Sequence, residues 1–87
     1  MRLSEMPNGT HGRVAGVCAA SPEVGPGVLR RLEELGFIAG EPVQLLRRGP
    51  GGREPLAVQV GESIFALRLL EAQCIQIHMA SFGGLAP

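Results

Sequence analysis

Apolar and polar residues alternate along short stretches of the chain. Residues 56–60 read Leu-Ala-Val-Gln-Val, so every second side chain is large and apolar. Such alternation is typical of a strand that buries one face and exposes the other. Gly61-Glu62 after it has the length of a tight hairpin turn, with a glycine available for positive φ. The predicted strands cover residues 12–19, 42–47, 56–60, 63–67 and 73–79.

The last predicted strand also has one apolar and one polar face. Its alternation places Ile75, Ile77 and Met79 on the buried face. Cys74 and His78 are therefore expected to point away from the core.

One segment has helical spacing instead. Its apolar residues recur every three to four positions, at Val28, Leu29, Leu32 and Leu35. Gly36 follows where a left-handed cap belongs, and Phe37 lies where an apolar side chain folds back onto the last turn. The pattern predicts a helix of about two to three turns, with Leu32 and Leu35 packed over one opening of the core.

The first strand is rich in small and β-branched residues. Residues 12–19 read Gly-Arg-Val-Ala-Gly-Val-Cys-Ala, which predicts close backbone packing at Gly16. Ahead of this strand, Leu3 and Met6 are expected to plug one end of the core.

Five closely spaced strands with one helix after the first indicate a mainly β fold, a small and strongly bent or closed barrel. Open edges on this much strand would invite aggregation. Residues 69–72 are interpreted as a link that covers the core. A chain of 87 residues has room for one domain, which we assign to residues 1–80, with a flexible tail at residues 81–87.

The ionisable residues restrict the chemistry. All eight basic residues are Arg and all eight acidic residues are Glu, and the net charge is zero. Without Lys there is no phosphate-loop lysine and no Schiff base. Without Asp there is no Ser-His-Asp triad, although a Glu can stand in for the Asp. We therefore predict a protein that is not an enzyme and has no cofactor.

Charge and aromatic content also restrict the partners. Balanced charge gives no cationic excess for phosphate contacts, and three Phe without Trp or Tyr provide few platforms for base stacking. No segment approaches the ~20 apolar residues of a membrane span, and the N-terminus lacks the apolar run of a signal peptide. The sequence predicts a cytoplasmic protein that neither binds nucleic acid nor inserts into a membrane.

The candidate metal ligands are scattered along the chain. No two His or Cys residues have a spacing that closes a chelate, so no dedicated site is predicted. Cys18 and Cys74 are interpreted as two separate small apolar side chains. His78, His11 and Cys74 are candidates for an adventitious surface site, which two molecules would share as a weak or metal-bridged homodimer.

The polar half of the predicted helix displays Arg30, Arg31 and Glu34 beside the apolar Leu29, a composition suited to docking another protein. The alternative is that these charges only solubilise the domain, because exposed charges usually contribute little. The candidate partner-binding residues are therefore Leu29, Arg30, Arg31, Glu34, Leu69 and Leu70.

The order and spacing of many elements resemble one known family. These elements are Leu3-Ser4-Glu5-Met6-Pro7, Gly12-Arg13-Val14, Leu32, Gly36-Phe37, Gly40, Val43, Gly49-Pro50-Gly51, Pro55, Val58, Val60-Gly61, Ala66-Leu67-Arg68, Glu71-Ala72, Ile75 and Ile77. Over about residues 2–79, the chain resembles FeoA, the small cytosolic accessory protein of bacterial ferrous iron uptake. The resemblance implies an SH3-like barrel with a helical insertion after the first strand. It also implies a partner, the membrane transporter FeoB, whose cytosolic G domain hydrolyses GTP.

Three functional hypotheses are considered. The first is a non-enzymatic accessory protein that regulates ferrous iron uptake by contact with FeoB. The alternative is a metal-binding carrier or sensor module for iron or zinc, and a second rival is a small barrel that binds nucleic acid. Residues 51–55 depart from the family, which usually has a shorter turn with an Asp before the Pro. The same barrel is also a C-terminal domain of iron-dependent repressors, so the fold alone does not decide the role.

Overall fold

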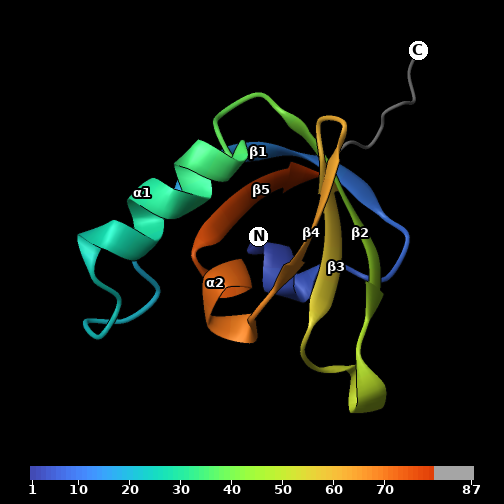
Figure 1. Ribbon diagram of the computed structural model, residues 1–87. Helices are drawn as coiled ribbons and strands as arrows, with labels where there is room; N and C mark the ends of the chain where they lie inside the picture. Colours follow the sequence, from blue (N-terminus) through green and yellow to red (C-terminus); the bar gives the residue numbers. More distant parts are fainter. Residues whose placement is uncertain (80–87) are drawn as a thin grey trace.

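A bent antiparallel sheet of five strands forms the centre of the molecule (Figure 1). The computed structural model describes residues 1–79, so the tail predicted at residues 81–87 lies outside the described residues. The elements are η1 (Leu3–Glu5), β1 (His11–Val17), α1 (Pro26–Leu35), β2 (Pro42–Arg48), η2 (Pro50–Gly52), β3 (Leu56–Val60), β4 (Ser63–Leu67), α2 (Leu69–Gln73) and β5 (Ile75–Met79). The mainly β fold and the helix between the first two strands are confirmed.

The sheet has the strand order β4-β3-β2-β1-β5, and all neighbouring strands are antiparallel. The first strand therefore pairs with the last, and Gly12 lies opposite Met79. The register shifts after Val14 in β1 and after Leu45 in β2. Irregularities of this kind bend a strand and increase its twist, which lets the sheet wrap around a single core.

The outer edge of β5 is covered by the start of the chain. Arg2 forms an isolated antiparallel bridge with Gln76, and the N–H of Ile77 donates to the carbonyl oxygen of Met1 over 2.7 Å. At the other end of the sheet is β4, and within residues 1–79 its outer side is paired with no strand. The two edges of the sheet therefore differ.

The N-terminal segment is anchored to the core. Leu3 and Met6 are fully buried, which confirms that they belong to the core. Arg48 in β2 secures the backbone of this segment, because its Nη2 donates to the carbonyl oxygens of Ser4 (2.7 Å) and Met6 (2.9 Å). One arginine side chain thus ties the start of the chain to the middle of the sheet.

Side chains from all five strands meet in the core. Its largest fully buried members include Phe37, Leu3, Met6, Leu32, Leu45, Leu56, Leu67 and Ile75. The strand positions predicted to face inward are buried, namely Val58, Val60, Ile75 and Ile77. On the helix, Leu32 is fully buried and Leu35 only half-buried. Burying a side chain of this size contributes about 1.5–3 kcal/mol.

The C-terminal end of α1 has the predicted cap. Gly36 has a φ of +117°, and its N–H donates to the carbonyl oxygen of Glu33 (3.0 Å). The N–H of Phe37 donates to the carbonyl oxygen of Leu32 (3.1 Å), which completes a Schellman motif. The buried Phe37 ring packs against Phe65 of β4, with 6.2 Å between the ring centroids. The cap therefore directs an aromatic anchor from the helix into the barrel.

Several element boundaries differ from the prediction: β1 begins at His11, β2 ends at Arg48, and β5 begins at Ile75 rather than at residue 73. The first strand ends at Val17 rather than at residue 19, and the predicted link at residues 69–72 belongs to the helix α2. A helix of five residues is too short to show a periodic apolar pattern. Neither helix within residues 1–79 has the length and apolar character needed to cross a membrane.

The outward orientation predicted for Cys74 is wrong. Cys74 ends α2 with φ −86° and ψ −8°, so it does not continue the strand alternation. Its side chain is fully buried, with Sγ 3.4 Å from the carbonyl oxygen of Leu70. The inward orientation predicted for Met79 is also wrong, because Met79 is 38% exposed. It lies opposite Gly12, which has no side chain to cover it.

Close backbone packing in β1 occurs at Gly12 and not at Gly16. A Cβ atom on Gly12 would lie 2.7 Å from Cγ2 of Ile77 and 2.9 Å from the carbonyl oxygen of His78, whereas one on Gly16 would have no neighbour within 4 Å. Gly16 instead occupies the register shift, with a φ of +153°. Close packing was therefore the wrong reason for a glycine at position 16. The positive φ of this residue is what favours glycine there.

Candidate partner surface

The outer face of α1 carries charges predicted to contact a partner. Successive helical residues are about 100° apart, so Arg30 and Glu34 share the face opposite the buried Leu32. Both are exposed, as is Arg31. Arg31 and Leu29 lie on opposite flanks of the helix, and the half-buried Leu29 packs against the core. The structure therefore shows a charged ridge, formed by Arg30, Arg31 and Glu34, with the apolar Leu29 at one margin. It does not show the mixed polar and apolar patch that the sequence predicted.

The second part of the predicted surface lies on α2. Leu70 is 42% exposed, whereas Leu69 is half-buried against the core. The two helices occupy different parts of the fold, because α1 packs on β1 and α2 packs on η1 and β5 (Figure 1). Of the pair on α2, Leu70 is thus the residue available to a partner.

The predicted metal ligands have different surroundings. His11 in β1 and His78 in β5 are both exposed. Arg13 lies directly opposite His78, so His11 occupies the diagonal position. The Nη1 of Arg13 donates to the carbonyl oxygen of Gly40 over 2.8 Å. The buried Cys74 lies elsewhere and is no surface ligand. Within residues 1–79, no three His, Cys or Glu side chains are grouped so that they could hold a metal ion.

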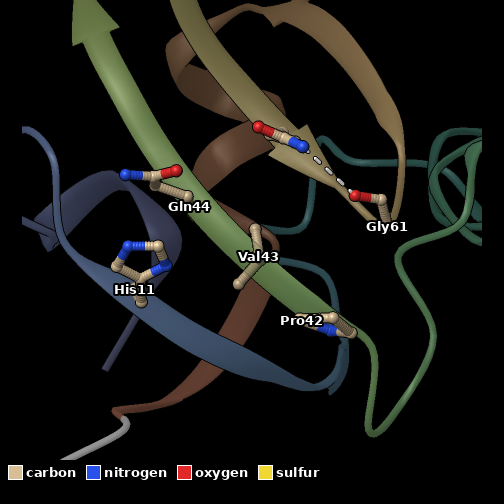
Figure 2. Close-up of a pocket in the computed structure, with 6 residues that line it drawn as sticks. His11, Pro42, Val43, Gln44 and Gly61 are labelled. Atoms are coloured by element: carbon tan, nitrogen blue, oxygen red, sulfur yellow. Dashed lines mark hydrogen bonds between the residues drawn. The ribbon is translucent and has the colours of Figure 1, made fainter.

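A small cleft opens on the sheet beside His11 (Figure 2). It has a volume of about 110 Å³ and is lined by His11, Pro42, Val43, Gln44, Gln59 and Gly61. His11 and Gln44 are cross-strand neighbours, and the Nε2 of Gln59 donates to the carbonyl oxygen of Gly61 over 3.4 Å. Ligand pockets usually measure about 300–1,000 Å³. The cleft therefore has room for a few water molecules and not for a substrate of ordinary size.

A wider hollow lies beside the turn after β2. It has a volume of about 460 Å³ and is lined by Arg47, Arg48, Gly49, Pro50, Pro55 and Ala57. Arg48 already donates to two carbonyl oxygens of the N-terminal segment, so its guanidinium has a structural role. Arg47 is the exposed cation of this hollow. One exposed arginine does not by itself make a binding site.

Comparison with family models matches residues 1–79 to FeoA, described as the FeoA domain. The chain belongs to the FeoA family. Comparison with curated protein sequences found no match.

Solved structures agree with this assignment. FeoA from Stenotrophomonas maltophilia, crystallised with zinc and described as a prokaryotic SH3 domain protein, is 44% identical, and the match covers 88% of each chain with a TM-score of 0.77. FeoA from Chlorobium tepidum is 31% identical, and the match covers 100% of this chain and 81% of that chain, also with a TM-score of 0.77. The predicted SH3-like fold is confirmed.

A likeness outside FeoA shows the fold alone. A manganese-dependent transcriptional repressor is 20% identical, and the match covers 92% of this chain and 41% of the repressor with a TM-score of 0.75. The same barrel thus occurs as part of a larger protein with another role.

Residues 51–55, which were predicted to depart from the family pattern, contact the neighbouring helix α2. The Oε1 of Glu54 accepts a hydrogen bond of 2.8 Å from the N–H of Leu69, the first residue of α2. The N–H of Gly49 contacts the carbonyl oxygens of Arg53 (3.0 Å) and Pro55 (2.9 Å), which closes the loop. Sequence analysis missed this role because nothing in the local pattern relates Glu54 to a helix of five residues.

Proposed function

We propose that this FeoA domain is an accessory protein of bacterial ferrous iron uptake, and that it acts by contact with the cytosolic G domain of the transporter FeoB. The observation that carries the proposal is family membership over residues 1–79. The relative from Stenotrophomonas maltophilia is named as a candidate activating factor for bacterial ferrous iron transport. The proposal places the protein in the cytoplasm, where that G domain lies.

The form of the molecule supports action by contact. The core is filled by apolar side chains, and the cleft beside His11 holds only about 110 Å³. The wider hollow of about 460 Å³ beside the turn after β2 has Arg47 as its exposed cation. The chain also lacks the Lys and Asp on which many catalytic sites depend. A small barrel of this kind presents its chemistry on its outer surface, so a non-catalytic, regulatory role fits it best.

We place the docking face on the charged ridge of α1, with Arg30, Arg31 and Glu34 as its polar residues and Leu29 at its margin. Guanidinium groups form directional contacts with carboxylates, which suits them to interfaces. The helix is rigidly attached through Leu32 and Phe37, which are both fully buried. Leu70 on α2 is the next candidate. If these charges only keep the domain in solution, their reversal will not affect binding.

The test is binding of the full chain to the purified cytosolic domain of FeoB at low salt. The double variant Arg30→Glu, Arg31→Glu should bind at least about tenfold more weakly, because attractive contacts become repulsive. The control is Arg47→Glu, Arg53→Glu, which makes the same change of charge at exposed positions off the helix and should bind like the wild type. If both double variants bind equally well, the docking face is not on α1. No binding by the wild-type protein rejects the partner.

The metal carrier or sensor remains the competing function, because the relative from Stenotrophomonas maltophilia was crystallised with zinc. The residues here fit such a site poorly. Zinc sites use three or four protein ligands, whereas this surface offers two histidines in diagonal positions with Arg13 beside them. Titration with ferrous iron and with zinc should therefore show no tight stoichiometric binding to the isolated monomer. Tight binding that is lost in His11→Ala and His78→Ala would favour the carrier.

A further inference from the structure

The outer edge of β4 lacks the usual protection against strand pairing. Within residues 1–79 no strand covers this edge, whereas the start of the chain covers the opposite edge at β5. Natural proteins usually protect a free edge with charged residues, proline or a bulge. The sequence of β4 is Ser-Ile-Phe-Ala-Leu, and its register with β3 is continuous over all five residues. The strand itself therefore offers a regular, uncharged template.

The side chains on the outer face of β4 are also open. Ile64 is 62% exposed, the highest value among the large apolar residues of the described chain, and Ala66 is exposed as well. Hydrogen bonding alternates along an antiparallel ladder, and a two-residue turn begins the ladder with a bonded pair. Ile64 and Ala66 therefore direct their N–H and C=O groups away from β3. The same two residues present unpaired backbone groups and an apolar surface.

The charges that flank β4 identify its occupant. Glu62 precedes the strand and Arg68 follows it, both are exposed, and each is three residues from Phe65. In an antiparallel pair of two such strands centred on Phe65, Glu62 of each copy lies opposite Arg68 of the other. Ile64 then lies opposite Ala66, so no like charges meet. The strand with its flanks is therefore complementary to itself.

We propose that β4 is a homodimerisation edge, at which two copies of this chain pair their β4 strands antiparallel about Phe65. A two-fold axis through that residue makes both halves of the contact equivalent. Opposite charges at facing positions of a ladder stabilise the pair, and like charges there destabilise it. The proposal is independent of the contact between α1 and FeoB.

The expected dimer is weak. Specific, stable interfaces bury about 1,200 Å² or more in total, and the pairing of two five-residue strands falls short of that area. We expect monomers at ~10 µM and a large dimer fraction at ~1 mM. Association should therefore be visible only over a wide range of concentration.

The first experiment is sedimentation velocity on the full chain over that range. Ile64→Lys places a charge on the open face and should abolish dimerisation. The control is Ile38→Lys, the same change at an isoleucine that is 49% exposed and lies outside β4, and it should dimerise like the wild type. Both variants should keep the wild-type unfolding midpoint, so that loss of association is not loss of fold. A monomer at every concentration overturns the proposal.

The second experiment tests register and direction. Glu62→Arg alone and Arg68→Glu alone each place like charges opposite one another at both ends, and each should weaken dimerisation about tenfold. When these two single variants are mixed, every facing pair is again opposite in charge. The mixture should form a heterodimer of near wild-type affinity. A dimer that is insensitive to the reversals, or that mixing does not restore, uses another surface and overturns the proposal.

Hydrogen exchange identifies the strand directly. The amide protons of Ile64 and Ala66 should exchange fast in dilute protein and slow down as the dimer forms. Slow exchange that does not depend on concentration means that another segment of the same chain occupies the edge, and this result also overturns the proposal.

Discussion

The barrel and the helix inserted into it are held in different ways. All five strands contribute buried side chains to one core, whereas α1, with ten residues, buries only Leu32 completely. Phe37, two residues after the end of α1, attaches the helix to the barrel through its contact with Phe65 of β4. With the docking face proposed on α1, stability depends on the barrel and recognition on the helix. Substitutions in the barrel should change folding, and substitutions on the outer face of α1 should change contacts with little effect on folding.

The largest effect is expected from a truncation in the barrel. Ile75 is fully buried, so Ile75→Ala removes transfer free energy and leaves a cavity, at a cost of about 2–5 kcal/mol. Urea unfolding followed by circular dichroism measures this cost. Ile64→Ala is the matched control, because Ile64 is 62% exposed and its truncation should cost about 0.5 kcal/mol or less. Equal costs for the two variants would contradict the assignment of the buried face.

A Gly→Ala substitution should destabilise the protein in the barrel and stabilise it in α1. Gly12→Ala forces a Cβ atom to within 2.9 Å of the carbonyl oxygen of His78, which costs about 1–3 kcal/mol. Gly27→Ala in α1 meets no atom within 4 Å and should stabilise the protein by about 0.4–1 kcal/mol. Thermal unfolding of both variants gives the signs. A stabilising Gly12→Ala would contradict the close approach of β1 to β5.

A substitution at Gly36, where α1 joins the barrel, should have an intermediate effect on stability. Gly36→Ala places an L side chain at a φ of +117°, while the nearest atom, Cγ1 of Val60, stays at an ordinary distance of 3.7 Å. The cost is therefore one of backbone conformation, about 1–2 kcal/mol. Gly36→Asn should lose less, because Asn tolerates left-handed conformations better. If the two variants unfold at the same urea concentration, backbone strain is not the cause.

The smallest effect on folding is expected on the outer face of α1. Arg30→Glu, Arg31→Glu should shift the free energy of unfolding by about 0.5 kcal/mol or less, although the same variant is expected to bind FeoB at least about tenfold more weakly. Urea unfolding of this double variant, measured together with its binding to FeoB, compares the effect on stability with the effect on recognition. A large loss of stability would mean that these arginines support the fold, and it would remove the separation between the two regions.

Most of the fold follows from local patterns in the sequence. The strands at residues 56–60 and 63–67 were predicted with their observed bounds, and so was the hairpin glycine, Gly61, with a φ of +57°. The helix cap at Gly36 and Phe37 was also predicted, because a Schellman motif depends on adjacent residues. These features need no knowledge of the rest of the chain.

Features that depend on distant contacts were not predictable in the same way. Cys74 was assigned to the outer face because strand alternation was extended through the end of a short helix. Gly12 was not singled out, because its neighbour is a strand more than sixty residues later in the sequence. The same limit applies to the candidate surface. Sequence pattern placed Arg30 and Glu34 on one face, but the buried side of Leu69 depends on packing against the core.

The pairing of the first strand with the last has a consequence for how the protein is made. Residues 12 and 79 are neighbours across the β1–β5 ladder, so the native topology has contacts of very long sequence separation, which slow folding. Until β5 has been synthesised, one side of β1 and the bridge from Arg2 have no partner. We therefore expect ribosome-bound chains that end before β5 to stay sensitive to protease, and protection to arise in one step once that strand has emerged.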